Sequence, residues 1–132
     1  MRVLLADDSS LILERLQEMV SNYKQIEIVG AFKNGIETLN AIRTMKPDLA
    51  IVDIKMPGLS GLYVLNEIRK DDKNVVFIIL TSYSSDYYRQ LAIHTGTNYF
   101  FSKADDFEKL TQVVAELLEK EKDHIGNIIS ID

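Results

Sequence analysis

The segment PDLAIVDIKMPG, at residues 47–58, contains the pattern that decides the fold. Its centre is an unbroken apolar run that ends in an acidic residue, and we predict a strand over Leu49–Asp53. A run without polar residues is typical of a strand covered on both faces, as in parallel sheets. Pro57 and Gly58 then supply turn chemistry. The segment therefore predicts a buried strand that carries Asp53 at its carboxyl end.

Short apolar segments of the same kind recur on both sides of this strand. We predict four further strands, at Arg2–Ala6, Ile26–Phe32, Val75–Thr81 and Asn98–Phe101. Glu27 interrupts the apolar pattern of the second segment, and a charged residue there suits a strand at the edge of a sheet.

Apolar residues at spacings of three and four predict helices between these strands. Four such stripes lie within residues 12–23, 36–45, 62–68 and 107–118. The last stripe is the clearest, and Asp105-x-x-Glu108 opens it as a variant of the capping box. A weaker helix is predicted over Ser84–Thr95, with Leu91 and Ala92 facing the core. The pattern thus predicts five helices.

Strict alternation of strands and helices with short links predicts an α/β fold with a parallel sheet and helices on both faces. Five strands fit a doubly wound, flavodoxin-like sheet, whose order 2-1-3-4-5 is taken from that fold and does not follow from the spacing. We assign residues 1–122 to the domain and residues 123–132 to a C-terminal tail rich in isoleucine. A disordered terminus, the start of a linker, an added edge strand and a docking segment all remain open for the tail.

Composition excludes several classes of protein. The 132 residues fit one domain, and 46% hydrophobic with 27% charged residues is an ordinary globular mixture. The absence of cysteine excludes a disulfide framework and a thiol nucleophile. A net charge of −5 argues against direct nucleic-acid binding, and no apolar run approaches the roughly 20 residues of a membrane span. We expect a cytoplasmic protein that does not enter a membrane.

Polar residues follow four of the predicted strands at their carboxyl ends, where ligands bind in open α/β sheets. They are Asp7, Asp8, Asp53, Thr81, Ser82, Ser102 and Lys103. Three neighbouring carboxylates repel one another unless a cation lies among them. Oxygen ligands without histidine or cysteine select a hard ion, and Mg²⁺ suits a site that water and phosphate complete.

The same residues fit phosphoryl transfer. Asp53 can attack phosphorus as a carboxylate nucleophile, while Lys103 and Thr81 can each cover one phosphoryl oxygen. Each residue also has an ordinary structural explanation, since Asp7 and Asp8 can cap the first helix and a single lysine is usually solvated. Their joint placement at four strand ends favours the functional interpretation.

The chain resembles the response-regulator receiver domains of two-component signalling, from Arg2 to about Lys120. The segments that carry the resemblance are residues 4–8, 47–58, 80–82 and 98–103, with Gly61 and Gly96. The Asp-x-x-Met-Pro-Gly pattern at residues 53–58, with the upstream pair Asp7-Asp8, is its most specific part.

The resemblance implies that Asp53 is the phosphoacceptor and that Mg²⁺ binds beside it. In the family's arrangement, Asp8 ligates the ion directly and Asp7 does so mainly through water. Asp53 and the main-chain carbonyl of Lys55 complete the protein ligands. The donor would be a sensor histidine kinase or a phosphotransfer protein. The chain would then be a phosphoacceptor switch that promotes its own phosphorylation and hydrolysis, and not an enzyme with a separate substrate.

The resemblance also assigns the residues that respond. Thr81 would bond a phosphoryl oxygen, Lys103 would pair with it, and Phe100 would be the switch aromatic that moves inward. The response is expected in the face formed by the fourth helix, the fifth strand and the fifth helix. This face would act on a downstream protein target or on an effector domain outside this chain.

One position departs from the common family pattern, and two others bear on the lifetime of the phosphoryl group. Ala104 follows Lys103 where many members have proline, so a phosphorylation-dependent dimer through the last helices is left open. Lys55 and Tyr83 stand at the two positions that tune phosphoryl lifetime in the family. Our hypothesis is that Tyr83 screens the acyl phosphate from water.

Exposed aromatic residues are candidates for contact with partners. Tyr63, Tyr87 and Tyr88 are such candidates, although one of the last two can equally pack in the core.

Two other functions were weighed. A haloacid-type phosphatase needs an acid two residues after the nucleophile, where this chain has Lys55. A flavin-binding electron carrier shares the architecture, but Asp7 and Asp8 would repel its phosphate. Both are disfavoured by the residues present.

Overall fold

Five parallel strands form one sheet in the order β2-β1-β3-β4-β5, which confirms the predicted fold class and order. The structure is a computed structural model that describes the backbone of residues 1–131 and the side chains of residues 1–121. The strands are β1 (Arg2–Ala6), β2 (Glu27–Phe32), β3 (Leu49–Val52), β4 (Val76–Thr81) and β5 (Tyr99–Ser102). Each predicted strand boundary lies within one residue of the observed one, and β2 lies at an edge as expected.

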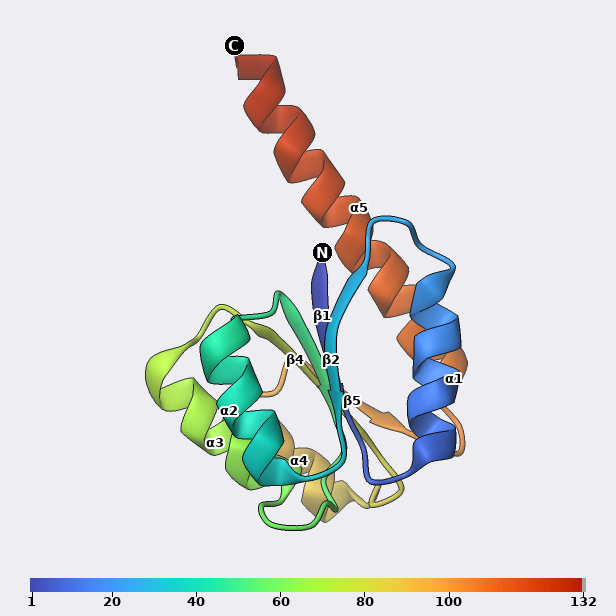
Figure 1. Cartoon of the computed structure of the whole chain (residues 1–132), viewed down its shortest axis with the longest axis vertical. Helices are drawn as coiled ribbons and strands as arrows, with labels where there is room; N and C mark the ends of the chain where they lie inside the picture. Colours follow the sequence, from blue (N-terminus) through green and yellow to red (C-terminus); the bar gives the residue numbers. More distant parts are fainter. Residues whose placement is uncertain (132) are drawn as a thin grey trace.

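Helices cover both faces of the sheet (Figure 1). They are α1 (Ser10–Ser21), α2 (Gly35–Met45), α3 (Gly61–Asp71), α4 (Asp86–Thr95) and α5 (Phe107–Ile131). Helices α1 and α5 pack on one face, while α2, α3 and α4 pack on the other. The side chains of Ser9, Asn34, Ser60 and Ser85 cap the first four helices by accepting a hydrogen bond from an N–H three residues later.

Strand β3 is buried on both faces because its side chains alternate between two hydrophobic clusters. Leu49 and Ile51 pack under α1 and α5, whereas Ala50 and Val52 pack under α2 and α3. The N–H of Asp53 donates to the carbonyl of Ala6 at 3.0 Å, so the pairing between β1 and β3 continues for one residue beyond β3. This bond fixes the start of the loop that follows β3.

Two details of the predicted helices are wrong. Leu91 is 39% exposed, whereas Ala92 is fully buried. Successive helix residues point about 100° apart, and α4 presents only a narrow stripe to the sheet. Helix α5 begins at Phe107, with the N–H of Leu110 donating to the carbonyl of Asp106, so Asp105 does not cap it.

Helix α5 continues without interruption across the predicted boundary between residues 122 and 123 and reaches Ile131. Its distal part extends away from the sheet in Figure 1. The side chains of the tail lie outside the described residues. Within the part of the chain that could be searched, no helix is both long and apolar enough to cross a membrane.

Candidate functional site

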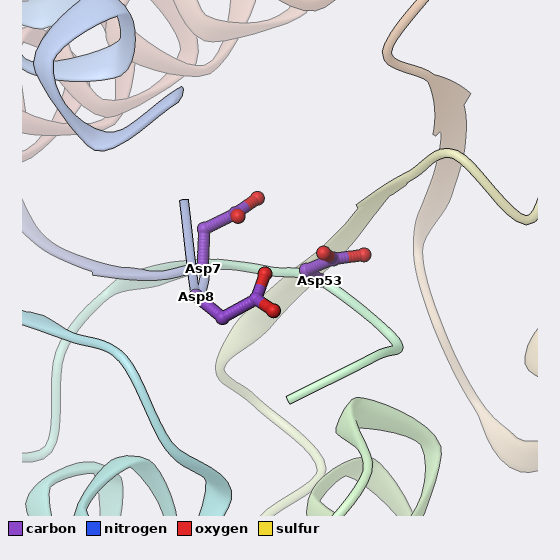
Figure 2. Close-up of side chains that lie close together, drawn as sticks. All are labelled: Asp7, Asp8 and Asp53. Carbon is purple, nitrogen blue, oxygen red and sulfur yellow. The ribbon is translucent and has the colours of Figure 1, made fainter. Parts of the chain in front are cut away.

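Three aspartates meet where β1 and β3 end. Asp7 and Asp8 follow β1 directly, and Asp53 follows β3. Ala6 lies opposite Val52 in the sheet, so the residues just beyond them are neighbours. One carboxylate oxygen of each aspartate lies within 4.8 Å of the others, and Figure 2 shows the side chains of Asp7, Asp8 and Asp53 gathered at this point. The structure therefore brings the predicted acidic cluster together.

Lys103 joins the two buried members of this cluster. Its Nζ lies 2.7 Å from Asp7 Oδ2 and 2.8 Å from Asp53 Oδ2. The loop after β5 holds the lysine in place, because the N–H of Lys103 donates to the carbonyl of Thr81 at 3.0 Å. Asp106 supports the same loop by accepting the N–H of Ser102 at 2.8 Å. A cation from the edge strand thus reaches across to the ends of β1 and β3.

The remaining oxygens of the two buried carboxylates are held by the main chain. Asp7 Oδ1 accepts the N–H of Ser9 at 2.9 Å, and Asp53 Oδ1 accepts the N–H of Ile54 at 2.7 Å. Asp8 is exposed. Among residues 1–121, whose side chains are described, no group donates a hydrogen bond to its carboxylate. A carboxylate oxygen has two lone pairs, so all three aspartates retain capacity for a metal ion.

Burial and charge shift the pKa values of two of these groups. Burial raises the pKa of the Asp7 carboxyl above its ordinary value, although the bonds from Lys103 and Ser9 oppose the rise; the nearby charge of Asp53 adds to it. Burial alone would lower the pKa of Lys103, but its bonds to Asp53 and Asp7 outweigh burial and raise it. The lysine is therefore a stable cation at neutral pH.

The donor set fits a hard divalent cation. It consists of three carboxylates that converge on one point, two buried and one exposed, and contains no nitrogen or sulfur ligand. Oxygen ligands of this kind suit Mg²⁺ or Ca²⁺, and Mg²⁺ keeps several waters when few protein ligands are present. The exposed position of Asp8 leaves such an ion open to solvent and to a phosphate group.

Thr81 ends β4 at the same edge of the sheet and is fully buried. Its Oγ1 accepts the N–H of Tyr83 at 3.0 Å. Phe100 is buried against the cluster that includes Ala92. The guanidinium carbon of Arg89 lies 4.8 Å from the centroid of the Phe100 ring. Phe100 thus lies against α4, while Thr81 is bonded to the loop that leads into it.

Tyr83, Tyr87 and Tyr88 form an aromatic group beside the site. Lys55 Nζ lies 6.0 Å from the ring centroid of Tyr83, which stacks on Tyr88 at 5.5 Å between centroids. Tyr87 and Tyr63 are exposed, whereas Tyr88 packs against the core. Of the two neighbouring tyrosines on α4, one therefore packs inward and the other faces solvent.

Two residues that support the site have no role assigned from the sequence. Gly61 is one, because a Cβ at this position would overlap the main-chain carbonyl of Asp53, and its N–H donates to the carbonyl of Ile54 at 2.7 Å. A glycine directly after the helix cap Ser60 was the available signal. Arg89 is the other, and nothing in its spacing distinguishes it from a solvated arginine.

Comparisons with known proteins agree with this geometry. The family described as the response regulator receiver domain matches residues 3–115. A protein-glutamate methylesterase/protein-glutamine glutaminase from Methanospirillum hungatei is 38% identical over 98% of this chain. The chain spans 37% of the length of that relative.

Solved structures with the same fold include two response regulators. The response regulator domain of CheB from Thermotoga maritima has a TM-score of 0.79 at 25% identity, covering 91% of this chain and 94% of that one. A DNA-binding response regulator of the LuxR family from Staphylococcus aureus has a TM-score of 0.80 at 27% identity, covering 87% of this chain and 96% of that one.

Proposed function

This chain belongs to the response regulator receiver domain family of two-component signalling, and from that premise we propose that it is a switch controlled by phosphorylation of Asp53. The observation that carries the proposal is the position of the Lys103 ammonium group, which contacts the carboxylates of both Asp7 and Asp53. The proposed nucleophile, a fixed cation and the proposed metal ligands therefore lie close together. Family membership also favours this function over the flavin carrier and the haloacid-type phosphatase.

These contacts support phosphoryl transfer to Asp53. A carboxylate oxygen of Asp53 attacks phosphorus, and the phosphorus–nitrogen bond of a phosphohistidine donor breaks with its electron pair remaining on the imidazole. Lys103 neutralises charge on the phosphoryl oxygens, and the Thr81 hydroxyl donates to one of them. Main-chain donors at Ile54 and Ser9 keep Asp53 and Asp7 oriented throughout.

We propose Mg²⁺ as the metal, held by Asp7, Asp8, Asp53 and the main-chain carbonyl of Lys55. When bound, this ion supplies positive charge that offsets repulsion between the carboxylates and the incoming phosphoryl group. The exposed carboxylate of Asp8 is the ligand that an ion entering from solvent meets first.

The phosphorylated state is proposed to act through the face formed by α4, β5 and α5. The family resemblance gives Thr81 and Phe100 as the switch residues of this face; we propose movement for Thr81, because Phe100 is already only 5% exposed. The donor is a sensor histidine kinase or a phosphotransfer protein in the cytoplasm, and the target is a protein or an effector domain outside residues 1–122. The methylesterase relative has such an additional region, but its activity is not assigned to this chain. We propose no enzymatic activity for this domain beyond transfer to Asp53 and hydrolysis of the product.

A mass measurement tests the core proposal. Incubation with Mg²⁺ and acetyl phosphate should add one phosphoryl group to the intact protein. Asp53→Asn should abolish the gain, whereas Asp71→Asn, at the end of α3, should leave it unchanged. Equal mass gain in Asp53→Asn and the unmodified chain would contradict the assignment.

A further inference from the structure

The switch aromatic has little room to move further inward. Phe100 is only 5% exposed and packs against the core cluster that contains Ala92. The guanidinium group of Arg89 covers its ring, and Arg89 Nη1 donates to the main-chain carbonyl of Phe100 at 3.4 Å. A phenyl ring has no hydroxyl that would favour a second, exposed position. Burial of Phe100 is therefore already nearly complete in this structure.

Thr81 has a direct link to a different aromatic residue. Its Oγ1 accepts the N–H of Tyr83 at 3.0 Å. A hydroxyl can donate its proton to a phosphoryl oxygen while it continues to accept a bond. Because the N–H of Tyr83 must follow the oxygen to keep this bond, a movement of Thr81 also moves the main chain at Tyr83.

Tyr83 in turn contacts the first turn of α4. Its ring stacks on Tyr88, with centroids 5.5 Å apart and planes inclined by 21°. Tyr88 also makes an edge contact with Tyr87, at 5.3 Å between centroids. Such aromatic pairs attract each other beyond the effect of the area that they bury. The stack can thus bias a local equilibrium.

Different contacts hold the two ends of helix α4. Arg69 from α3 donates from Nε to the carbonyl of Gly96 at 2.9 Å and from Nη2 to Asn98 Oδ1 at 2.9 Å. Within α4, whose residues are all described, Ala92 is the one buried side chain. The first turn is therefore held by the aromatic stack, by packing of Tyr88 on the core and by Arg89 over Phe100. The last turn is anchored to α3 and to the start of β5.

We propose that phosphorylation reaches α4 in this chain through Thr81, Tyr83 and Tyr88, and that Phe100 is a fixed part of the core. The inference rests on the proposed phosphorylation of Asp53. The Tyr83–Tyr88 stack is a positioning element. It determines where the first turn of α4 lies, and Tyr88 does not contact the phosphoryl group.

Hydrogen exchange separates this route from one through Phe100. Exchange of the backbone amides in residues 86–91 is measured with and without Mg²⁺ and acetyl phosphate, and intact mass gives the phosphorylated fraction. The unmodified chain should change its exchange rates by at least about fivefold, the lower end of usual coupling between sites. Tyr88→Leu, which keeps an apolar side chain but removes the stack, should reach the same mass with a change below about twofold.

Three further variants complete the test. Phe100→Leu, the matched control, should keep the full exchange response, and Tyr88→Phe should restore it because the ring is retained. Tyr83→Leu breaks the same stack from an exposed loop position and should lose the response as Tyr88→Leu does, even if Tyr88→Leu fails to fold. A full response in folded Tyr88→Leu or in Tyr83→Leu, or loss of the response in Phe100→Leu, overturns the proposal. A missing mass gain in the unmodified chain would instead refute phosphorylation itself.

Discussion

Replacing Lys103 with methionine removes the cation that joins Asp7 and Asp53 while retaining most of the side-chain volume. The ammonium makes two short contacts, at 2.7 and 2.8 Å, and the lysine side chain is 13% exposed. Hydrogen bonds to charged groups each contribute roughly 1.5–3 kcal/mol, and loss of a partner from a buried ion pair costs about 3–5 kcal/mol. Because Asp7 can take up a proton, we expect the lower part of this range, about 3 kcal/mol, without Mg²⁺.

Urea unfolding in the presence and absence of Mg²⁺ measures this effect. Saturating Mg²⁺ should restore much of the lost free energy of unfolding in Lys103→Met, because the ion supplies positive charge to the same carboxylates. Lys70→Met removes an exposed pair with Glu67 and should leave the stability nearly unchanged in either condition, because solvent screens such pairs. This account of the site would be refuted if Lys103→Met were as stable as the unmodified chain without Mg²⁺. It would also be refuted if the stability of Lys103→Met did not respond to Mg²⁺.

Three other substitutions test separate parts of the site. Asp7→Asn should raise the free energy of unfolding without Mg²⁺ by about 1 kcal/mol, because burial already disfavours the ionised form, and calorimetry should show weaker Mg²⁺ binding. A destabilised Asp7→Asn would contradict that reasoning. Gly61→Ala should lower stability by about 1–3 kcal/mol in urea and slow phosphorylation, since the added Cβ overlaps the Asp53 carbonyl; an unchanged rate of mass gain would argue against this constraint. Tyr83→Ala should speed loss of the phosphoryl group after the donor is removed, as followed by intact mass, whereas the exposed Tyr87→Ala should not; equal lifetimes in all three chains would exclude screening by Tyr83.

The strands and the convergence of site residues could be predicted because they depend on local pattern. An apolar run such as Leu49–Val52 requires cover on both faces, and the carboxyl ends of parallel strands share one edge of the sheet. Asp7, Asp8 and Asp53 were therefore expected to meet, and they do. The strand order came from the resemblance to a known fold, because spacing alone does not determine which strands are neighbours.

What the sequence did not predict depends on contacts between distant elements. The exposure of Leu91 follows from the narrow contact of α4 with the sheet, which a helical period cannot reveal. The position of Arg89 over Phe100 arises only after α4 and β5 have packed. The stack of Tyr83 on Tyr88 depends on the path of the loop between β4 and α4, which a helical period does not reveal. Similarly, Asp106 holds the Lys103 loop through Ser102, and this removes Asp105 from the predicted cap.

The lysine that joins Asp7 and Asp53 also has a consequence for the valence of the ion that the site accepts. When the three carboxyl groups are ionised, the site has a net charge of −2, because Lys103 offsets one of the charges of Asp7, Asp8 and Asp53. A divalent ion brings the site to electroneutrality, whereas a monovalent ion leaves it anionic and repulsive to a phosphate donor. By contributing one positive charge permanently, Lys103 sets the charge that the exchangeable ion must supply.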